Sequence, residues 1–357
     1  MKSHEQIGLQ RLASQQVAQP SSDDAATIVR SMGAIQAQDY LGALWAVGLR
    51  TLRASEQTVE QALAEARIVR TWPMRGTIHF VAPKDVRWML TLLTPRIVRL
   101  GQTRLRGLAI DAATLAASEV ALGVALEGGR QLTRPKLYAE LEQAEIATSG
   151  QRGVHILGQL SMAGLLCFGA RAGKQPTFTL LDEWVPPTSP LSHDEALAKL
   201  VGRYFTSHGP ATLHDFAWWS GLTMADARAG LAAAADQLAE SRLDGRSYFA
   251  ARGLNVNDAA SEVFLLPSFD EFLLAYRDRT VVLDPAHANR VVPGSNGLFT
   301  PIVVAGGRVV GTWRRELKPG RVALSYNLFD ELGPLDWQTL DEQGARYGRF
   351  LNTVVEP

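Results

Sequence analysis

The spacing of apolar residues changes from helical to strand-like several times along the chain. In the N-terminal part apolar side chains recur at helical spacing, and the helices that this spacing predicts cover 5–17, 23–32, 41–50 and 56–65. Strand-like runs follow at 67–72 and 76–81, joined by the turn-like Pro73-Met74-Arg75. Because helices followed by a two-stranded ribbon make up a winged helix-turn-helix unit, we predict such a unit here, followed by an amphipathic helix that opens at Pro83.

The same order of elements recurs twice more. A helix after Thr133, a helix over 153–163 and a ribbon over 168–181 make up a second unit. In a third unit, helices precede and follow the turn at Ser220-Gly221, and a hairpin turns at Asp244-Gly245. The chain therefore repeats one architecture three times, with little repetition of the sequence itself.

From about residue 256 the pattern favours strands. The strands that it predicts cover 263–266, 281–283, 301–304, 308–312 and 322–326, ahead of a final helix over 336–351. We therefore predict a fold that is mainly α with β, in which tandem winged helix-turn-helix units precede a C-terminal β-barrel-like domain. Its parts are a first winged-helix unit with a basic helix (1–125), a second winged-helix unit (126–187), a third winged-helix unit (188–255) and the β-rich C-terminal domain (256–357).

The composition is that of a globular protein, with 46% hydrophobic and 20% charged residues among 357. No apolar run reaches the roughly 18 residues of a membrane-spanning helix, and residues 1–5 lack the apolar core of a signal peptide. We therefore expect a cytoplasmic protein with no membrane partner. Cys167 lies in an apolar run, where a buried and inert thiol is expected.

Charge is unevenly distributed, although the chain as a whole is neutral. Residues 1–180 carry 20 Lys and Arg against 14 Asp and Glu, and the remainder carries the opposite excess. Within 66–110, nine basic residues accompany one acid, Asp85. A local basic surface of this kind is what phosphate binding requires, while a solvated charged face is the alternative.

Two side-chain amides follow the second predicted helix. Gly33 is the kind of residue that ends a helix, and Gln36 and Gln38 come directly after it. Residues two apart share a face in extended backbone, so the two amides are able to converge on one bound group. The alternative is that both are ordinary surface glutamines.

The first ribbon carries a second group of unusual residues. Arg75 lies at the predicted turn, and Thr77 and His79 share a strand face from which they reach a nucleic-acid groove. In the alternative interpretation Trp72 and Met74 are core residues, and His79 is a buried polar residue with its hydrogen bonds satisfied. The basic helix that follows carries Arg87, Arg96 and Arg99 on its polar side.

Other common chemistries are not indicated. The sequence contains no phosphate-cradling glycine loop, no dinucleotide fingerprint and no His or Cys pair at metal-ligand spacing, so we predict neither cofactor nor metal. Asp270, Glu271 and Asp278 surround a short apolar stretch. An enzyme that uses these carboxylates on a small cytosolic substrate is a further alternative, against which helix capping and pairing with arginine are the simpler interpretation.

Several motifs together resemble the winged-helix DNA glycosylase superfamily over nearly the whole chain. They are Gly33-Ala34-Ile35-Gln36-Ala37-Gln38, Trp72-Pro73-Met74-Arg75-Gly76-Thr77-Ile78-His79, His208-Gly209-Pro210-Ala211-Thr212, Leu266-Pro267-Ser268-Phe269-Asp270-Glu271 and Gly311-Thr312-Trp313. At the position of Gln38 the YcaQ-like branch has a carboxylate. The amide found here resembles the motif of the AlkZ-like branch. The resemblance implies tandem winged helices and a C-terminal β-barrel that form a C-shaped clamp on DNA.

The resemblance also implies a function. Gln36 and Gln38 would be the catalytic residues, Asp39 would support them if a base is required, and a monomer would bind double-stranded DNA carrying alkylated purines, associated with the nucleoid. The DNA-binding residues would be Arg70, Arg75, Thr77, His79, Arg87, Arg96 and Arg99. We predict a monofunctional DNA glycosylase of base-excision repair that removes bulky N7- or N3-alkylated purines and unhooks interstrand crosslinks. The alternative is a non-catalytic winged-helix regulator, which would bind DNA as a symmetric dimer.

Overall fold

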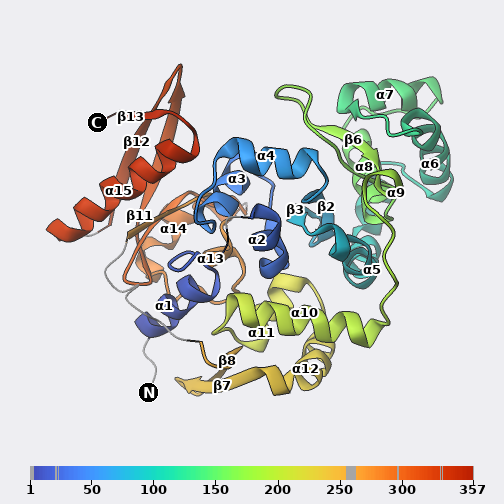
Figure 1. The fold of residues 1–357 in the computed structure, drawn as a ribbon. Coiled ribbons are helices and arrows are strands. Elements are labelled where there is room, and N and C mark those ends of the chain that lie inside the picture. Colours follow the sequence, from blue (N-terminus) through green and yellow to red (C-terminus); the bar gives the residue numbers. More distant parts are fainter. Residues whose placement is uncertain are drawn as a thin grey trace. The chain divides into compact units, whose positions relative to one another are not determined.

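The computed structural model describes residues 4–20, 22, 24–254, 263–295, 297–329, 331 and 333–356. The chain divides into two compact units of non-contiguous segments, drawn as a ribbon in Figure 1. Unit 1 comprises Met1–Glu60, Leu197–Trp219 and Thr223–Pro357, and unit 2 comprises Gln61–Ala196 and Ser220–Leu222. The segment order of unit 1 shows that its N-terminal helices share a core with the C-terminal half of the chain.

Unit 1 begins with the elements that carry the glutamine motif. These are α1 (His4–Ser14), α2 (Ala25–Met32), β1 (Ala34–Gln36) and α3 (Tyr40–Leu49), after which α4 (Glu56–Ala64) leads into unit 2. Asp24 caps α2 by accepting the Thr27 N–H, and Gly33 ends it at φ +80°. The helix and its end match the prediction from the sequence, with Asp24 as the observed cap.

The C-terminal half of unit 1 contains helices, a hairpin and a sheet. Its elements are the end of α10 (His193–His208), α11 (Leu213–Ser220), α12 (Met224–Ala233), β7 (Leu238–Leu243), β8 (Arg246–Ala251), β9 (Val263–Leu266), α13 (Glu271–Leu274), α14 (Ala288–Val291), β10 (Ile302–Ala305), β11 (Arg308–Lys318), β12 (Arg321–Leu328), α15 (Pro334–Phe350) and β13 (Val354–Glu356). The β7–β8 hairpin turns at Asp244 and Gly245, which both have positive φ, as predicted.

The C-terminal strands form a half-barrel sheet in the order β13-β12-β11-β10-β9. Trp45 of α3 joins the N-terminal helices to this sheet, because its indole N–H donates to the Leu265 carbonyl at 2.8 Å. The Trp45 ring also packs against Tyr347 and Phe350 of α15 at centroid distances of 5.0 and 5.1 Å. The helix that follows the glutamine motif is therefore fixed in the core of unit 1.

Unit 2 combines a sheet with helices. Its elements are β2 (Val69–Met74), β3 (Thr77–Val81), α5 (Pro83–Gly107), α6 (Ala112–Leu126), β4 (Leu132–Thr133), α7 (Arg134–Gln143), α8 (Arg152–Met162), β5 (Leu166–Phe168), β6 (Thr177–Leu180) and α9 (Leu181–Trp184). Its strands follow the order β3-β2-β5-β6-β4, and Arg70 pairs with Phe168 where β2 meets β5. The two ribbons predicted separately thus pair in one sheet.

The core of unit 2 lies between its helices and this sheet. Leucines and isoleucines of α5 to α8 pack against Phe168 and Phe178, and Trp72 stacks on Phe168 at a centroid distance of 4.9 Å. The alternative interpretation, in which Trp72 and Met74 are core residues, is therefore confirmed, since Trp72 is partly buried against this core and Met74 is fully buried.

Two details of the predicted elements are wrong. The turn between β2 and β3 is at Arg75-Gly76, where φ is +53° and +70°, because Pro73 and Met74 still belong to β2. Residues 281–283 form a turn although a strand was predicted. These residues are apolar because they are buried, and Val282 is 0% exposed. A short apolar run is expected both of a buried strand and of a buried turn, so the sequence pattern did not distinguish the two.

Candidate active site

The glutamine motif spans the end of a strand and the start of a helix. The extended segment ends at Gln36, Gln38 lies in a bend, and α3 begins at Tyr40. Asp39 is the N-cap residue of α3, and in the described structure its side chain makes no capping hydrogen bond. A Cβ on Gly42 would lie 2.6 Å from Asp39 Oδ2, so the glycine leaves room for this carboxylate above the first turn.

The two amides differ in their surroundings. Gln36 is 6% exposed, whereas Gln38 is exposed and Asp39 is partly exposed. The expectation that both share one face depended on an extended backbone through residue 38, and β1 is shorter than that. Gln36 is consequently part of the protein interior, and Gln38 is open to solvent at the start of α3.

Glu271 lies beneath the motif and is fully buried. Its Oε1 accepts the Gln36 backbone N–H at 3.0 Å, and its Oε2 accepts the Trp219 indole N–H at 3.0 Å. His208 Nε2 lies 3.7 Å from the same Oε2. Burial lowers the pKa of His208, and the nearby Glu271 carboxylate opposes that shift.

The neighbouring carboxylate has a different partner. Both oxygens of Asp270 accept from the Arg50 guanidinium at 2.8 Å, and the side chains of Arg50 and Asp270 are 0% and 1% exposed. Arg50 also donates to Gln15 Oε1 at 3.0 Å, and Gln15 donates to the Tyr276 hydroxyl. A bidentate pair of this kind is rigid, so the C-terminal end of α3 is fixed to the start of α13.

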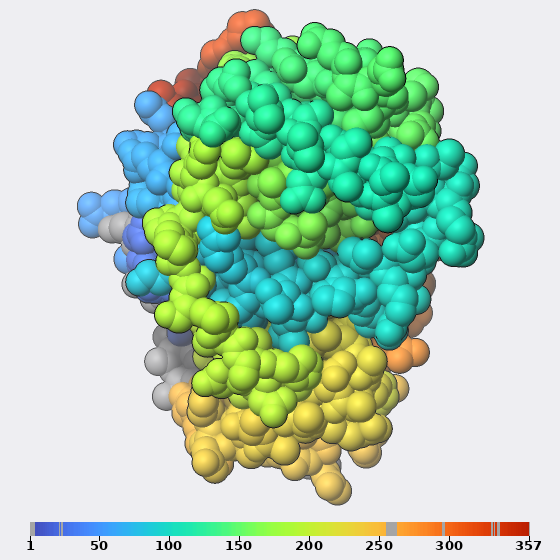
Figure 2. All heavy atoms as spheres, turned by 90° about the vertical axis from the view of Figure 1, so that its right-hand side faces the viewer, coloured from blue at the N-terminus to red at the C-terminus, as the bar shows by residue number. Residues whose placement is uncertain are grey.

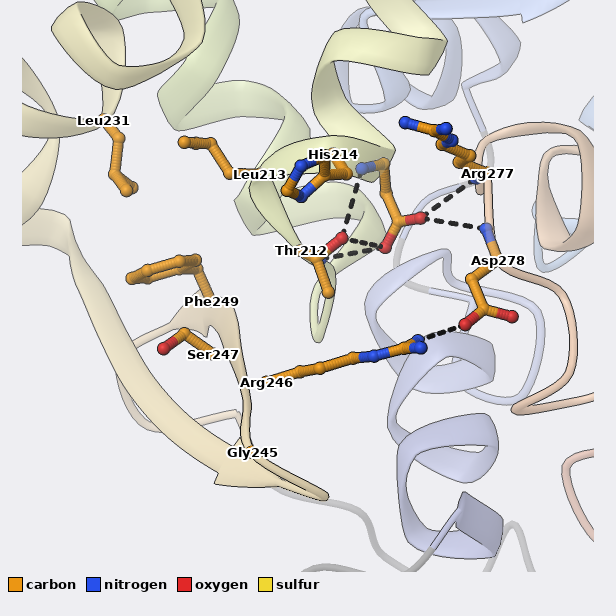
Figure 3. A pocket seen from close by; sticks show the side chains of 11 residues that line it. Thr212, Leu213, His214, Leu231, Gly245, Arg246, Ser247, Phe249, Arg277 and Asp278 are labelled. Atoms are coloured by element: carbon orange, nitrogen blue, oxygen red, sulfur yellow. Dashed lines mark hydrogen bonds and ion pairs between the residues drawn. The ribbon is translucent and has the colours of Figure 1, made fainter. Parts of the chain in front are cut away.

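These contacts bear on the small-substrate alternative. Asp270 and Glu271 are buried and bonded to separate partners, while Asp278 lies at the wall of a cavity of about 750 Å³ shown in Figure 3. In that cavity Arg246 and Asp278 form an ion pair, and His214, Arg277 and Phe249 are among the residues of its wall. The structure does not bring the three carboxylates to one site.

The β2–β3 ribbon carries four of the predicted DNA-binding residues. Arg75, partly exposed at the turn, has its Nη2 3.5 Å from His79 Nε2, and His79 Nδ1 is 3.0 Å from the Thr77 carbonyl. His79 is fully buried, as in the alternative interpretation of this residue, and Thr77 is partly exposed. Arg70 covers the Phe168 ring, with its guanidinium carbon 4.4 Å from the ring centroid.

The basic helix presents its arginines differently. Arg87 pairs with Asp182 at 2.5 Å and donates to the Val185 carbonyl, so its charge is partly neutralised. Arg96 is partly exposed and Arg99 is exposed. Figure 2 shows α5 in cyan at the surface of unit 2, beside the yellow-green segment that follows Val185.

Metal-binding clusters and membrane-spanning helices are the two remaining features of the described residues. Within the ranges that the structure describes, no three His, Cys, Asp or Glu side chains gather as a metal site, and the prediction of no metal and no cofactor stays a prediction. No single helix in the same ranges is long and apolar enough to cross a membrane, while α5 and α6 together pass by length and composition and are bent by 100° at their junction.

Comparison with known proteins identifies the class of protein. The family model described as DNA glycosylase AlkZ-like matches residues 29–350. The chain therefore belongs to the AlkZ-like DNA glycosylase family and is an enzyme of that class, which confirms the resemblance found in its motifs.

Relatives from Streptomyces sahachiroi make the assignment more specific. The chain is 29% identical over 316 residues to its interstrand DNA cross-link repair glycosylase, covering 83% of this chain and 82% of the relative. The solved structure of S. sahachiroi DNA glycosylase AlkZ matches with a TM-score of 0.81 and 25% identity, covering 99% of both chains. The mixed α and β fold is therefore confirmed, and membership of a family of enzymes argues against the alternative of a non-catalytic regulator.

Proposed function

We propose that this DNA glycosylase hydrolyses the N-glycosidic bond of bulky N7- or N3-alkylated purines in double-stranded DNA and unhooks interstrand crosslinks. Gln36 and Gln38 are its catalytic residues, the protein acts as a monomer, and tandem winged helix-turn-helix units hold the DNA. The observation that carries the proposal is a buried Gln36 with an anchored backbone, two residues before an exposed Gln38, in a chain of this family.

The substrate's own charge makes two amides sufficient. A neutral amide is a poor general base, but a purine alkylated at N7 or N3 is cationic and leaves without strong acid catalysis. What remains is to hold a water and to stabilise the oxocarbenium-like sugar, which oriented carbonyl dipoles do in a preorganised site. Gln36, with its fixed backbone, supplies such a dipole, and Gln38 contacts the deoxyribose and the water from the solvent side.

Asp39 supports this chemistry if a true base is required. It is partly exposed at the start of α3, next to Gln38, and its carboxylate lies against the first turn of the helix, where Gly42 leaves room for it. Cleavage through a Schiff base needs an amine nucleophile. Lys84, Lys136 and Lys174, the lysines of the first half besides Lys2, are not near the motif in sequence, which supports hydrolysis without strand cleavage.

The site and the relative support the proposed substrate class. The S. sahachiroi relative is named for interstrand cross-link repair, and we extend that activity to this chain. An exposed Gln38 suits an adduct too large for a closed base pocket, because the damaged nucleotide then reacts at the protein surface.

Base release from a duplex containing one N7-alkylguanine tests the proposal. Gln36→Ala and Gln38→Ala should each lower the single-turnover rate of excision about 100-fold, the effect of removing one preorganised dipole. Gln338→Ala, which changes an exposed glutamine of α15, should leave the rate unchanged. Wild-type rates in both motif variants would exclude these residues from catalysis, and the absence of base release by the wild type from alkylated and crosslinked duplexes would exclude the activity.

A further inference from the structure

Glu271 connects the glutamine motif to a segment 235 residues later in the chain. Its two carboxylate oxygens have separate donors, the Gln36 backbone N–H and the Trp219 indole N–H, each at 3.0 Å. The carboxylate is fully buried, and an ionised group in that position is tolerated only when hydrogen bonds replace its water. The contact with Gln36 is thus one of the hydrogen bonds that stabilise this carboxyl group in the interior.

Asp270, adjacent to Glu271 in the sequence, provides a second anchor for the segment that contains the motif. Arg50, at the C-terminal end of α3, binds both oxygens of Asp270, while Gln36, ahead of α3, is bound by Glu271. The Asp270 side chain also accepts the Phe272 N–H and so fixes the start of α13. The segment from Gln36 to Arg50, which contains Gln38 and Asp39, is held at both ends by adjacent carboxylates.

We propose that Glu271 is a positioning residue for Gln36. By fixing the backbone of Gln36 it sets the direction in which the catalytic amide points, and this proposal rests on the proposed function of that amide. Glu271 is itself 0% exposed, so it does not touch the substrate and acts through Gln36. A displacement of about 1 Å at a catalytic group is enough to reduce a rate by about two orders of magnitude.

The isosteric variant Glu271→Gln isolates this role. A glutamine accepts through one oxygen and donates through its nitrogen, so one of the two N–H groups that face residue 271 then meets another donor. Trp219→Phe removes the indole N–H that donates to Glu271 and disturbs the same core. It keeps the hydrogen bond from the Gln36 backbone N–H to the carboxylate, and is therefore the matched control.

Single-turnover excision and duplex binding are measured for both variants, alone and in the Gln36→Ala background. We expect Glu271→Gln to lower the rate at least about tenfold with little change in Kd for the damaged duplex, and Trp219→Phe to lower it less. In the Gln36→Ala background Glu271→Gln should cause no further loss, because two residues that act through one group are not additive. Should Glu271→Gln fail to fold, Glu271→Asp, which withdraws the carboxylate by one methylene, takes its place with the same expectations.

The outcomes separate this proposal from the proposed function. An equal further loss in the Gln36→Ala background would assign Glu271 to the core alone and overturn its positioning role, as would an unchanged rate in Glu271→Gln. If Gln36→Ala itself retained the wild-type rate, the assignment of Gln36 would fail, and the positioning role would fail with it for that separate and visible reason.

Discussion

His208 is a buried titratable group in the core of unit 1 whose protonation bears on stability. It is fully buried, and its Nδ1 is 2.8 Å from the Ser207 hydroxyl. Its ring stacks on that of Tyr204, with the two ring centroids 4.9 Å apart. Burial lowers its pKa against the opposing effect of Glu271, so the folded protein binds a proton at this site less readily than the unfolded chain.

Acidification should therefore destabilise the protein through His208. In the unfolded chain the histidine pKa is about 6.5, so below that pH the unfolded state binds the extra proton and the free energy of unfolding falls. The loss is at most about 1.4 kcal/mol per pH unit and ends at the lower pKa of the folded state. Urea unfolding at pH 7.5, 6.5 and 5.5 measures it. His208→Asn should flatten this dependence, and an unchanged slope in that variant would assign the effect to other groups.

The roles of single residues were predicted correctly from the sequence where those roles depend on neighbouring residues in the chain. Gly33 ends α2, and Cys167 is an inert buried thiol, since burial raises its pKa to about 12. The Glu271 contact with Gln36 was not predicted, because nothing in the pattern of either segment relates positions 235 residues apart. The motif suggested catalytic amides, and the fold added the carboxylate that accepts the backbone N–H of Gln36.

At the scale of elements, the predictions succeeded where caps and turns are encoded locally. The β7–β8 hairpin at Asp244-Gly245 is one such case. They failed at 281–283, where an apolar run packs without joining the sheet, and they separated two ribbons that pair through Arg70 and Phe168. Strand pairing between distant segments depends on long-range packing, which the period of apolar residues does not report.

Two helical glycines test how tightly α3 is packed. A Cβ on Gly48 would lie 2.3 Å from the Phe350 ring, whereas one on Gly123 of α6 would meet nothing within 4 Å. Gly48→Ala should lower the free energy of unfolding by about 1–3 kcal/mol through overpacking. Gly123→Ala should raise it by about 0.5–1 kcal/mol by restricting the unfolded chain. Urea unfolding of both variants measures the difference, and equal effects would show that α3 yields to the added methyl.

For the molecule as a whole, the neutral net charge conceals a basic region. The nine basic residues of 66–110 all belong to unit 2, and they differ in whether they form ion pairs and in how exposed they are. Arg87 is paired with Asp182 and Arg67 with Glu65, whereas Arg99 is exposed on α5. The excess of positive charge was predicted from the sequence, but the ion pairs depend on the fold. Among the predicted DNA-binding residues, Arg87 is the one whose role in phosphate binding is most weakened, because its charge is paired with Asp182.

Arg75 is the residue through which the basic region is best tested, because it lies partly exposed at the turn of the β2–β3 ribbon. If it contacts a phosphate, Arg75→Glu should weaken duplex binding and reduce the slope of log K against log salt by about one, since one fewer counterion is released. Arg321→Glu makes the same charge change on β12, outside the predicted winged-helix units, at a side chain 61% exposed, and should leave the slope as it is. Titrations of a labelled duplex at several salt concentrations give both slopes. Equal slopes in wild type and Arg75→Glu would remove the ribbon turn from the DNA interface, and equal losses in both variants would show that binding depends on total charge instead of on this surface.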